Sequence, residues 1–262
     1  MRGPTHFEIR ACALALLVYG LAVPLVPAGT APPAIPVAAP VVAPDVVPAA
    51  EAAGSGPPAA VDERPSPVPR VVYEVVDAPA LARTVALTFD DGPDPRWTPQ
   101  VLDLLARHGA VATFCLLGEN AARHPDLVAD IVDAGMRLCD HSRTHELDPA
   151  APQDGLAHDE LVELAGTGVE WFRAPRGEWS RAVQVAVGAA GMRPLGWSVD
   201  SRDWTRPGTG AIVRQVQQHV HPGAVVLLHD GGGPREQTVE ALEELLPWLA
   251  AQCYSTAFPD GR

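Results

Sequence analysis

Residues 84–109 read TVALTFDDGPDPRWTPQVLDLLARHG, and this stretch decides the fold class. Its first part, Thr84–Phe89, is predominantly apolar and of strand length, and a charged turn follows it. Pro99–His108 then places apolar residues on one side and stops at Gly109, which is typical of a helix with a C-terminal glycine. The stretch therefore predicts one β-strand followed by one α-helix.

The same order recurs along the rest of the chain. Further strands are predicted at Val111–Leu117, Trp171–Ala174, Leu195–Val199 and Ala224–His229. Further helices are predicted at Asp126–Ala134, Arg181–Ala190, Gly210–Val220 and Arg235–Ala250. Repeated β-then-α order predicts an α/β fold with parallel strands and crossover helices, in a barrel or an open sheet. In such folds the chemistry lies at the C-terminal ends of the strands.

Two segments of different composition precede this region. Residues 1–28 combine Arg2 and Arg10 with an apolar run from Ala11 to about Pro27, which predicts an export signal, with a retained membrane anchor as the alternative. Residues 29–70 are rich in Pro, Ala and Val and predict a disordered, extended linker. We therefore expect one folded domain at 71–262 in an exported protein, either secreted or held at the cell surface.

Charge and cysteine usage narrow the partners and the environment. The formal net charge of −13 argues against nucleic acid or anionic lipid as the main partner, because both bind through basic patches. An uncharged or amine-bearing polymer fits this charge, and we expect a monomer. Cys115 lies mid-strand and predicts a buried thiol, with a disulfide between two of Cys115, Cys139 and Cys253 as the alternative.

Adjacent carboxylates and paired histidines supply the first candidate chemistry. Asp90 and Asp91 follow the first predicted strand, and two neighbouring carboxylates are costly to hold together unless a cation or a proton lies between them. His141 and His145 are four residues apart, so both rings can point at one site. A solvated turn and two surface histidines are the alternatives for each motif alone. Together, one carboxylate and two histidines form a metal-ligand set with open positions for water and substrate.

Three further clusters follow later predicted strands: FRAPRG at 172–177, DSRDW at 200–204 and VVLLHD at 225–230. An arginine at a strand end, such as Arg173, commonly holds a carboxylate. The last strand places Leu227 and His229 on one face. Asp90 can then act as a base on metal-bound water, and His229 as an acid on the leaving group. This combination predicts metal-assisted hydrolysis of an acyl bond.

These five motifs, in this order, resemble those of the polysaccharide deacetylases with the NodB homology domain, a carbohydrate esterase family. The resemblance extends over about Arg83 to Phe258 and depends most on TFDDGP at 88–93 and on His-Ser-x-x-His at 141–145. It implies an irregular (β/α) barrel. It also implies removal of acetyl groups from N-acetylglucosamine in peptidoglycan or chitin, or from acetylated xylan.

The resemblance assigns the metal and the base. Asp91, His141 and His145 would bind a divalent cation, most commonly zinc, with cobalt or nickel as alternatives. Asp90 would deprotonate the metal-bound water, and Arg173 would orient Asp90.

It also assigns the remaining roles. The backbone N–H of Arg176 would stabilise the oxyanion. His229 would protonate the leaving amine and Asp203 would tune it, while Trp204 and Leu227 would line the acetyl pocket and the groove.

One departure concerns Arg176, because the family commonly has Tyr or Phe there. The oxyanion contact is made by the backbone, so catalysis need not stop, but a cation beside the groove changes which sugar or anionic group is favoured. An N-deacetylase is therefore the leading hypothesis. An O-acetyl esterase acting on acetylated xylan or peptidoglycan and a non-catalytic cell-wall-binding module are the alternatives.

Overall fold

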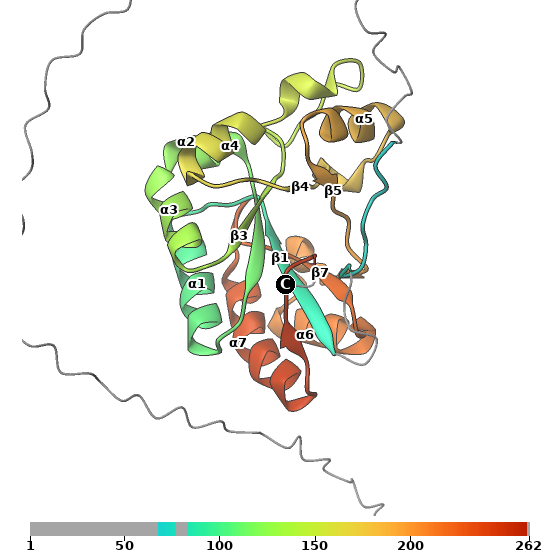
Figure 1. Cartoon of the computed structure of the whole chain (residues 1–262). Helices are drawn as coiled ribbons and strands as arrows, with labels where there is room; N and C mark the ends of the chain where they lie inside the picture. The colour runs from blue at the N-terminus through green and yellow to red at the C-terminus, as the bar shows by residue number, and fades with distance from the viewer. Residues whose placement is uncertain (1–67, 77–82, 261–262) are drawn as a thin grey trace, which may run out of the picture. The chain divides into compact units, whose positions relative to one another are not determined.

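The structure, a computed structural model, describes residues 68–76 and 83–260 (Figure 1). The predicted export signal at 1–28 lies outside the described residues. So does the predicted linker at 29–70, except for its last three residues. Among the residues that are described, no helix combines the length and the apolar character needed to cross a bilayer.

The described strands form one eight-stranded sheet whose pairings are all parallel. Its order is β5-β4-β3-β2-β1-β7-β6, and the short β8 pairs with the start of β1. The strands are β1 (Thr84–Asp90), β2 (Ala112–Leu116), β3 (Arg137–Asp140), β4 (Trp171–Phe172), β5 (Arg193–Pro194), β6 (Val199–Asp200), β7 (Ala224–His229) and β8 (Ser255–Thr256).

The helices surround this sheet in Figure 1, with α1 and α3 on one side and α5 on the opposite side. They are α1 (Thr98–Arg107), α2 (Gly118–Arg123), α3 (Pro125–Asp133), α4 (His158–Ala165), α5 (Arg181–Ala189), α6 (Thr209–His219) and α7 (Glu236–Ala251). Three short 3-10 helices lie in loops: η1 (Pro152–Gly155), η2 (Pro175–Gly177) and η3 (Asp203–Thr205).

Alternation along the strands gives the sheet two buried faces. Val85, Leu87 and Phe89 of β1 belong to the core that packs against the helices, whereas Ala86 belongs to a second, smaller core. The members of that second core are Val75, Ala86, Cys115, Cys139, Trp171, Leu195 and Val225. It fills the concave side of the sheet, so the sheet is curved around its own side chains.

The segment at 72–75 lies across the opening between the two edges of the curved sheet. Val72 forms a parallel bridge with Leu195, next to the edge strand β5, and Glu74 forms an antiparallel bridge with Ala224 at the start of β7. These contacts partly close the sheet, which confirms the predicted irregular (β/α) barrel. Cys115 and Cys139 are buried, free thiols inside it, so the disulfide alternative is wrong for these two residues.

The predicted strand at Leu195–Val199 is wrong. The chain instead forms β5 at 193–194 and β6 at 199–200, and these strands pair with β4 and β7 on opposite edges of the sheet. Between them the Gly196 N–H donates to the Val72 carbonyl at 2.7 Å. The apolar run at Leu195–Val199 therefore connects the two edges of the sheet and does not form one strand. The periodicity of apolar residues alone does not distinguish these two cases.

The other predicted strands and helices are present within one or two residues of their predicted ends, and β7 has the predicted bounds. The sequence patterns missed β3, α2, α4 and β8. β3 and β8 are only four and two residues long, and α2 and α4 have six and eight. Elements this short give too few repeats for a period to be recognised.

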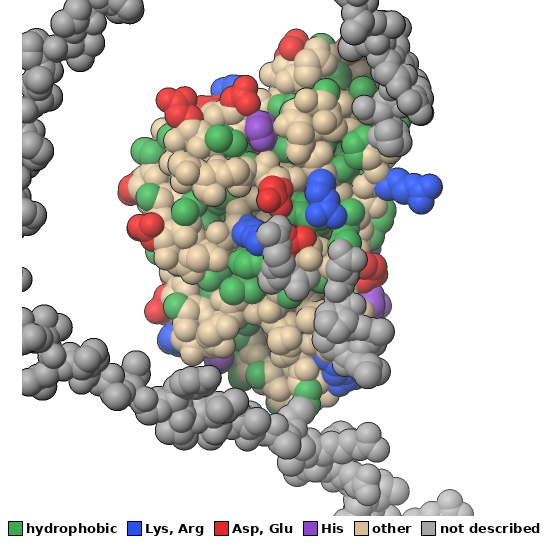
Figure 2. Space-filling view, viewed as in Figure 1, with side chains coloured by type: hydrophobic (Ala, Val, Ile, Leu, Met, Phe, Trp, Pro, Cys, Tyr) green, Lys and Arg blue, Asp and Glu red, His purple; other side chains and the backbone are tan. Residues whose placement is uncertain are grey.

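Acidic side chains are prominent on the face of the domain shown in Figure 2, where many lie along the edge formed by α2 and α3. This distribution is in keeping with the net charge of −13. The basic side chains on this face, all of them arginines, are fewer and stand apart from one another. The visible face therefore carries no extended basic surface.

Replacing Phe114 by Ala is expected to destabilise the domain by about 3–5 kcal/mol. Phe114 is fully buried in β2 and stacks on Phe89 with ring centroids 5.3 Å apart, so truncation leaves a cavity in the main core. Urea unfolding of the full chain measures the effect. The control is Val185→Ala on α5, a half-exposed site whose change should stay within about 0.5 kcal/mol. Equal stability of the two variants would contradict this account of the core.

Candidate metal centre and acid–base groups

The predicted site residues converge at the C-terminal ends of the central strands. Asp90 ends β1 and His229 ends β7, and the two are direct partners in the parallel ladder. They open into a cavity of about 550 Å³, within the range of ordinary ligand sites. Its lining residues are Asp90, Asp91, His141, His145, Arg176, Trp197, Asp200, Trp204, Leu227, His229 and Arg235.

Asp91, His141 and His145 form the one group of described residues arranged to hold a metal ion, with ligand atoms within 4.8 Å of one another. Asp91 Oδ1 lies 3.5 Å from His141 Nε2 and 3.6 Å from His145 Nε2. The same oxygen is buried and has no hydrogen-bond partner among the described residues. A buried carboxylate oxygen without a donor is costly, and a shared cation would satisfy it. The donor set therefore fits a divalent metal.

The second nitrogen of His141 is also fixed. His141 Nδ1 lies 2.8 Å from the Arg173 carbonyl oxygen, so Nδ1 carries the proton and donates it there. Nε2 is then left as a lone-pair donor facing Asp91. His141 is buried, whereas the His145 side chain is one-third exposed, so the site has an inner ligand and an outer one.

A buried carboxylate holds the loop that carries both histidines. Asp140 Oδ1 accepts from the Ser142 N–H at 2.7 Å, and Oδ2 accepts from the Ala157 N–H at 3.0 Å. Burial raises the pKa of Asp140 to about 7, even though both of these N–H donors favour the charged form. Ser142 and His145 both have positive φ, 69° and 66°, so the loop turns twice through a left-handed conformation. Asp140 thereby fixes the position of His141 relative to the start of α4.

Asp90 is held in its charged form by an arginine. Arg173 Nη1 donates to Asp90 Oδ1 at 2.7 Å and to Thr88 Oγ1 at 2.8 Å. Burial by itself would raise the pKa of Asp90, but positive charge nearby, chiefly that of Arg173, outweighs it and holds that pKa below its usual value. Asp90 is therefore ionised at neutral pH and able to accept a proton.

His229 is held by a buried carboxylate. Its Nδ1 lies 2.7 Å from Asp203 Oδ1, while its backbone N–H and the Thr238 hydroxyl both donate to Asp203 Oδ2 at 2.8 Å. Burial lowers the pKa of His229, but the hydrogen bond and charge of buried Asp203 raise it more, so the net shift is upward. The imidazolium form is favoured, with Nε2 as its second donor.

The remaining predicted residues border the same cavity. Trp204 is 55% exposed and offers a free ring face, while Leu227 is buried on the same strand face as His229. Arg176 has a positive φ of 56° on η2, and its Nη2 lies 2.6 Å from Glu146 Oε1.

Three lining residues were not predicted as site residues: Asp200, which lies within the DSRDW motif, and Trp197 and Arg235, which lie in none of the five motifs. The Trp197 ring lies so close to Gly177 that a Cβ there would come within 2.6 Å of it. Arg235 is buried, its Nε donates to the Gly231 carbonyl at 2.6 Å, and its Nη2 lies 3.9 Å from Asp91 Oδ2. Trp197 fell within the wrongly predicted strand and Arg235 at a predicted helix start, so neither stood out as a site residue.

Asp230, beside His229, is also buried. It accepts from the Thr98 hydroxyl at 2.5 Å, and burial raises its pKa to about 7.

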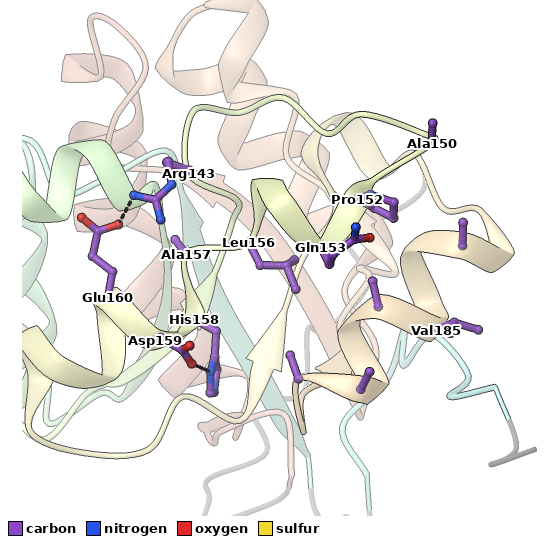
Figure 3. Close-up of a pocket in the computed structure, with 14 residues that line it drawn as sticks. Arg143, Ala150, Pro152, Gln153, Leu156, Ala157, His158, Asp159, Glu160 and Val185 are labelled. Carbon is purple, nitrogen blue, oxygen red and sulfur yellow. Dashed lines mark hydrogen bonds and ion pairs between the residues drawn. The ribbon is translucent and has the colours of Figure 1, made fainter. Parts of the chain in front are cut away.

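A larger cavity of about 680 Å³ lies between α5 and the η1–α4 region (Figure 3). Its charged side chains are paired with one another: Arg143 with Glu160 at 2.6 Å, and His158 with Asp159 at 2.9 Å. The α5 side presents alanines and Val185. This cavity includes none of the metal-ligand set and neither of the acid–base groups, so size alone does not identify the reactive site.

Comparison with known proteins agrees with the sequence motifs. The family model "Polysaccharide deacetylase" matches residues 77–195. The chain is 41% identical over 185 residues to a chitooligosaccharide deacetylase of Sinorhizobium fredii, covering 64% of this chain and 86% of that protein. It is 38% identical over 190 residues to a peptidoglycan-N-acetylglucosamine deacetylase of Bacillus cereus, covering 70% of this chain and 89% of the relative.

Solved structures agree as well. A peptidoglycan N-acetylglucosamine deacetylase structure superposes with a TM-score of 0.66 at 31% identity, covering 72% of this chain and 91% of the other. A pseudoenzyme of carbohydrate esterase family 4 from Bacillus anthracis superposes with a TM-score of 0.65 at 27% identity, covering 72% and 66%.

Removing a metal ligand should abolish tight metal binding while leaving the fold in place. His141→Ala is expected to weaken Zn²⁺ binding by at least about 100-fold, because it removes the inner ligand of a three-residue set. Isothermal calorimetry on the full chain measures the change, and His158→Ala in the other cavity is the control. Unchanged Zn²⁺ affinity in His141→Ala would disprove this metal site.

Removing the partner of His229 should lower the pKa of His229. In Asp203→Asn the stabilising charge is lost while the burial remains, so the imidazolium is favoured less. An NMR titration of the His229 ring in metal-free protein follows the shift, with His158 as the internal reference. If His229 is the acid, the alkaline limb of the rate profile should move to lower pH in the same variant. An unchanged or raised His229 pKa would contradict the assignment.

Proposed function

The chain belongs to the polysaccharide deacetylase family, and from that premise we propose that it is a metal-dependent hydrolase of N-acetyl groups on N-acetylglucosamine polymers, peptidoglycan or chitin-like. The observation that carries this proposal is the convergence of Asp90, His229 and the Asp91–His141–His145 set on one cavity. Metal ligands, an ionised base and a protonated acid are the parts that hydrolysis of an amide requires.

When bound by Asp91, His141 and His145, a divalent cation, with zinc as our first choice and cobalt or nickel next, supplies a Lewis acid that polarises the acyl oxygen and acidifies water. This assignment is supported by Asp91 Oδ1, which is buried without a hydrogen-bond partner among the described residues and faces the Nε2 atoms of both His141 and His145.

The protein's own groups move the protons. Asp90 takes a proton from the attacking water, and Arg173 keeps Asp90 charged and oriented at 2.7 Å. His229 gives a proton to the leaving amine nitrogen, and Asp203 holds the ring in place at 2.7 Å. The pKa of Asp90 is lowered and that of His229 is raised, so at one pH the base is ionised and the acid is protonated.

Binding groups surround these two residues. The backbone N–H of Arg176 is proposed as an oxyanion donor, and Leu227 as the wall of the acetyl pocket. The exposed face of Trp204 can stack on a sugar ring.

Two alternatives, a non-catalytic cell-wall-binding module and an O-acetyl esterase, are less well supported. Because a pseudoenzyme shares the fold at a TM-score of 0.65, likeness of fold does not argue for turnover. The complete set of metal ligands, base and acid argues for turnover. It therefore disfavours a module that only binds the polymer. The similar proteins named as chitooligosaccharide and peptidoglycan-N-acetylglucosamine deacetylases favour amide over ester substrates.

We also propose that the enzyme is exported and acts as a monomer outside the cytoplasm, free or tethered to the membrane by its N-terminus. The apolar run after Arg10 and the Pro/Ala-rich composition of 29–70 support export. A polymer of the cell surface would then be within its reach.

The enzyme with Zn²⁺ or Co²⁺ bound should release acetate from an N-acetylglucosamine oligomer. Asp90→Asn should lower kcat by at least about 100-fold, because it removes the general base. Mass spectrometry of chitin oligomers, peptidoglycan fragments and acetylated xylan follows the loss of acetyl groups with Zn²⁺ or Co²⁺ present. Retained Zn²⁺ affinity in Asp90→Asn is the control for an intact site. Acetate release unaffected by this substitution would rule out the mechanism, and release from xylan alone would favour the esterase.

A further inference from the structure

Arg176 lies where two cavities meet. It lines the catalytic cavity of about 550 Å³ and also a neighbouring one of about 470 Å³. The walls of the second cavity combine apolar residues, among them Leu147, Trp179 and Val183, with the carboxylates of Glu146 and Glu178. A polymer with one sugar in the catalytic cavity could extend its next unit, or a substituent, past Arg176 into this space.

Arg176 already holds a carboxylate. Its Nη2 lies 2.6 Å from Glu146 Oε1, and the two side chains are 48% and 69% exposed. An ion pair this exposed contributes little stability, so another carboxylate could take the place of Glu146 at small cost. The Arg176 backbone is constrained by Pro175 before it and by Gly177 after it, which packs against Trp197. The side chain can therefore change partner while the loop stays in place.

The acids at the centre of the catalytic cavity have closer partners. Asp90 pairs with buried Arg173 at 2.7 Å, and Asp91 faces the two histidines and lies 3.9 Å from Arg235. The guanidinium of Arg235 is buried and donates to backbone carbonyls. Arg176 thus differs from Arg173 and Arg235 in having an exposed and replaceable partner.

We propose that Arg176 is a specificity-determining residue that binds a carboxylate carried by the substrate, in exchange for Glu146. The preferred substrate class is then an N-acetylated glycan in which the reacting sugar or its neighbour bears a carboxylate, rather than a neutral glycan. The planar guanidinium suits this role because it can bind a carboxylate through two hydrogen bonds. The proposal rests on the proposed deacetylase function and adds the substrate class. It concerns one local contact, whereas the repulsion from the net charge of −13 is long-range and is screened by salt beyond about 10 Å.

The test compares two substrates that differ only in charge. One is a peptide-free peptidoglycan tetrasaccharide whose lactyl ether groups carry free carboxylates, and the other is its methyl ester. In the wild-type enzyme loaded with Zn²⁺, kcat/KM for acetate release should be higher for the acid. Arg176→Gln should reduce the acid-to-ester ratio by about two- to fivefold, the effect of one exposed charge-assisted contact.

Glu146→Gln should change the same ratio in the opposite direction, because it removes the competing carboxylate and leaves Arg176 in place. The matched control is Glu160→Gln, which breaks the Arg143–Glu160 pair, also 2.6 Å long but lining the other cavity in Figure 3. This variant should leave the ratio unchanged. Dissociation constants for both glycans, measured by calorimetry with Asp90→Asn as the background, should follow the same pattern.

Each outcome has one meaning. Equal acid-to-ester ratios in wild type, Arg176→Gln and Glu146→Gln would overturn the proposal while leaving the deacetylase function intact. Equal losses on acid and ester in both variants would mean that the ion pair only holds the loop, and would overturn it too. If the wild type releases no acetate from either glycan or from a chitin oligomer, the proposed function fails. The calorimetric ratios then decide whether Arg176 still selects a carboxylate.

Discussion

The ion pair between Arg173 and Asp90 is the interaction on which both the barrel and the site depend. Both side chains are buried, with 0% and 4% exposure, and their atoms lie 2.7 Å apart. A buried charge is tolerated only when it is paired and its remaining donors are satisfied. Arg173 meets that condition by also donating to Thr88 Oγ1 and to the carbonyls of Leu195 and Gly196. It therefore links β4, β1 and the β5–β6 connection across the concave side of the sheet.

This placement explains why the reactive groups lie at one level of the barrel. Asp90 is the in-register partner of His229 on one side and of Cys115 on the other, and Cys115 is the partner of Cys139. The thiols fill the interior without adding charge, so the charged groups gather where β1 and β7 meet the cavity. The carbonyl of Arg173 also accepts from His141 Nδ1, so one residue orients both the proposed base and a proposed metal ligand. The hydrogen bonds that hold the barrel together are thus the same ones that position the proposed site.

Much of this arrangement could be predicted from the sequence because the motifs follow apolar strands directly. The pattern at 224–229 gave the right bounds for β7, and the alternation along it correctly placed His229 with Leu227 on the inner face. Asp91, His141 and His145 were predicted as one set, and the structure brings them together. The strand predicted at Leu195–Val199 was wrong because this run passes from one edge of the sheet to the other. Which strands pair with it is decided by residues far away in the sequence, and the local pattern does not show them. Trp197 reaches the cavity only because of that crossing, and the contact of Arg176 with Glu146 joins residues 30 positions apart.

The adjacent carboxylates that first indicated a metal site also show how the fold separates two like charges. Asp90 stays in the strand and points inward, where the fixed cation of Arg173 compensates it. Asp91 leaves the strand through a positive φ of 71°, and its carbonyl accepts from Asn120 Nδ2 at 2.7 Å, which holds the turned backbone. Its own oxygen Oδ1 is left buried between two imidazole nitrogens, and none of the described residues donates a hydrogen bond to it. Arg173 thus supplies a permanent cation for Asp90, whereas Asp91 is left open to the exchangeable cation that we propose for it. Such a division would keep Asp90 charged with or without that cation.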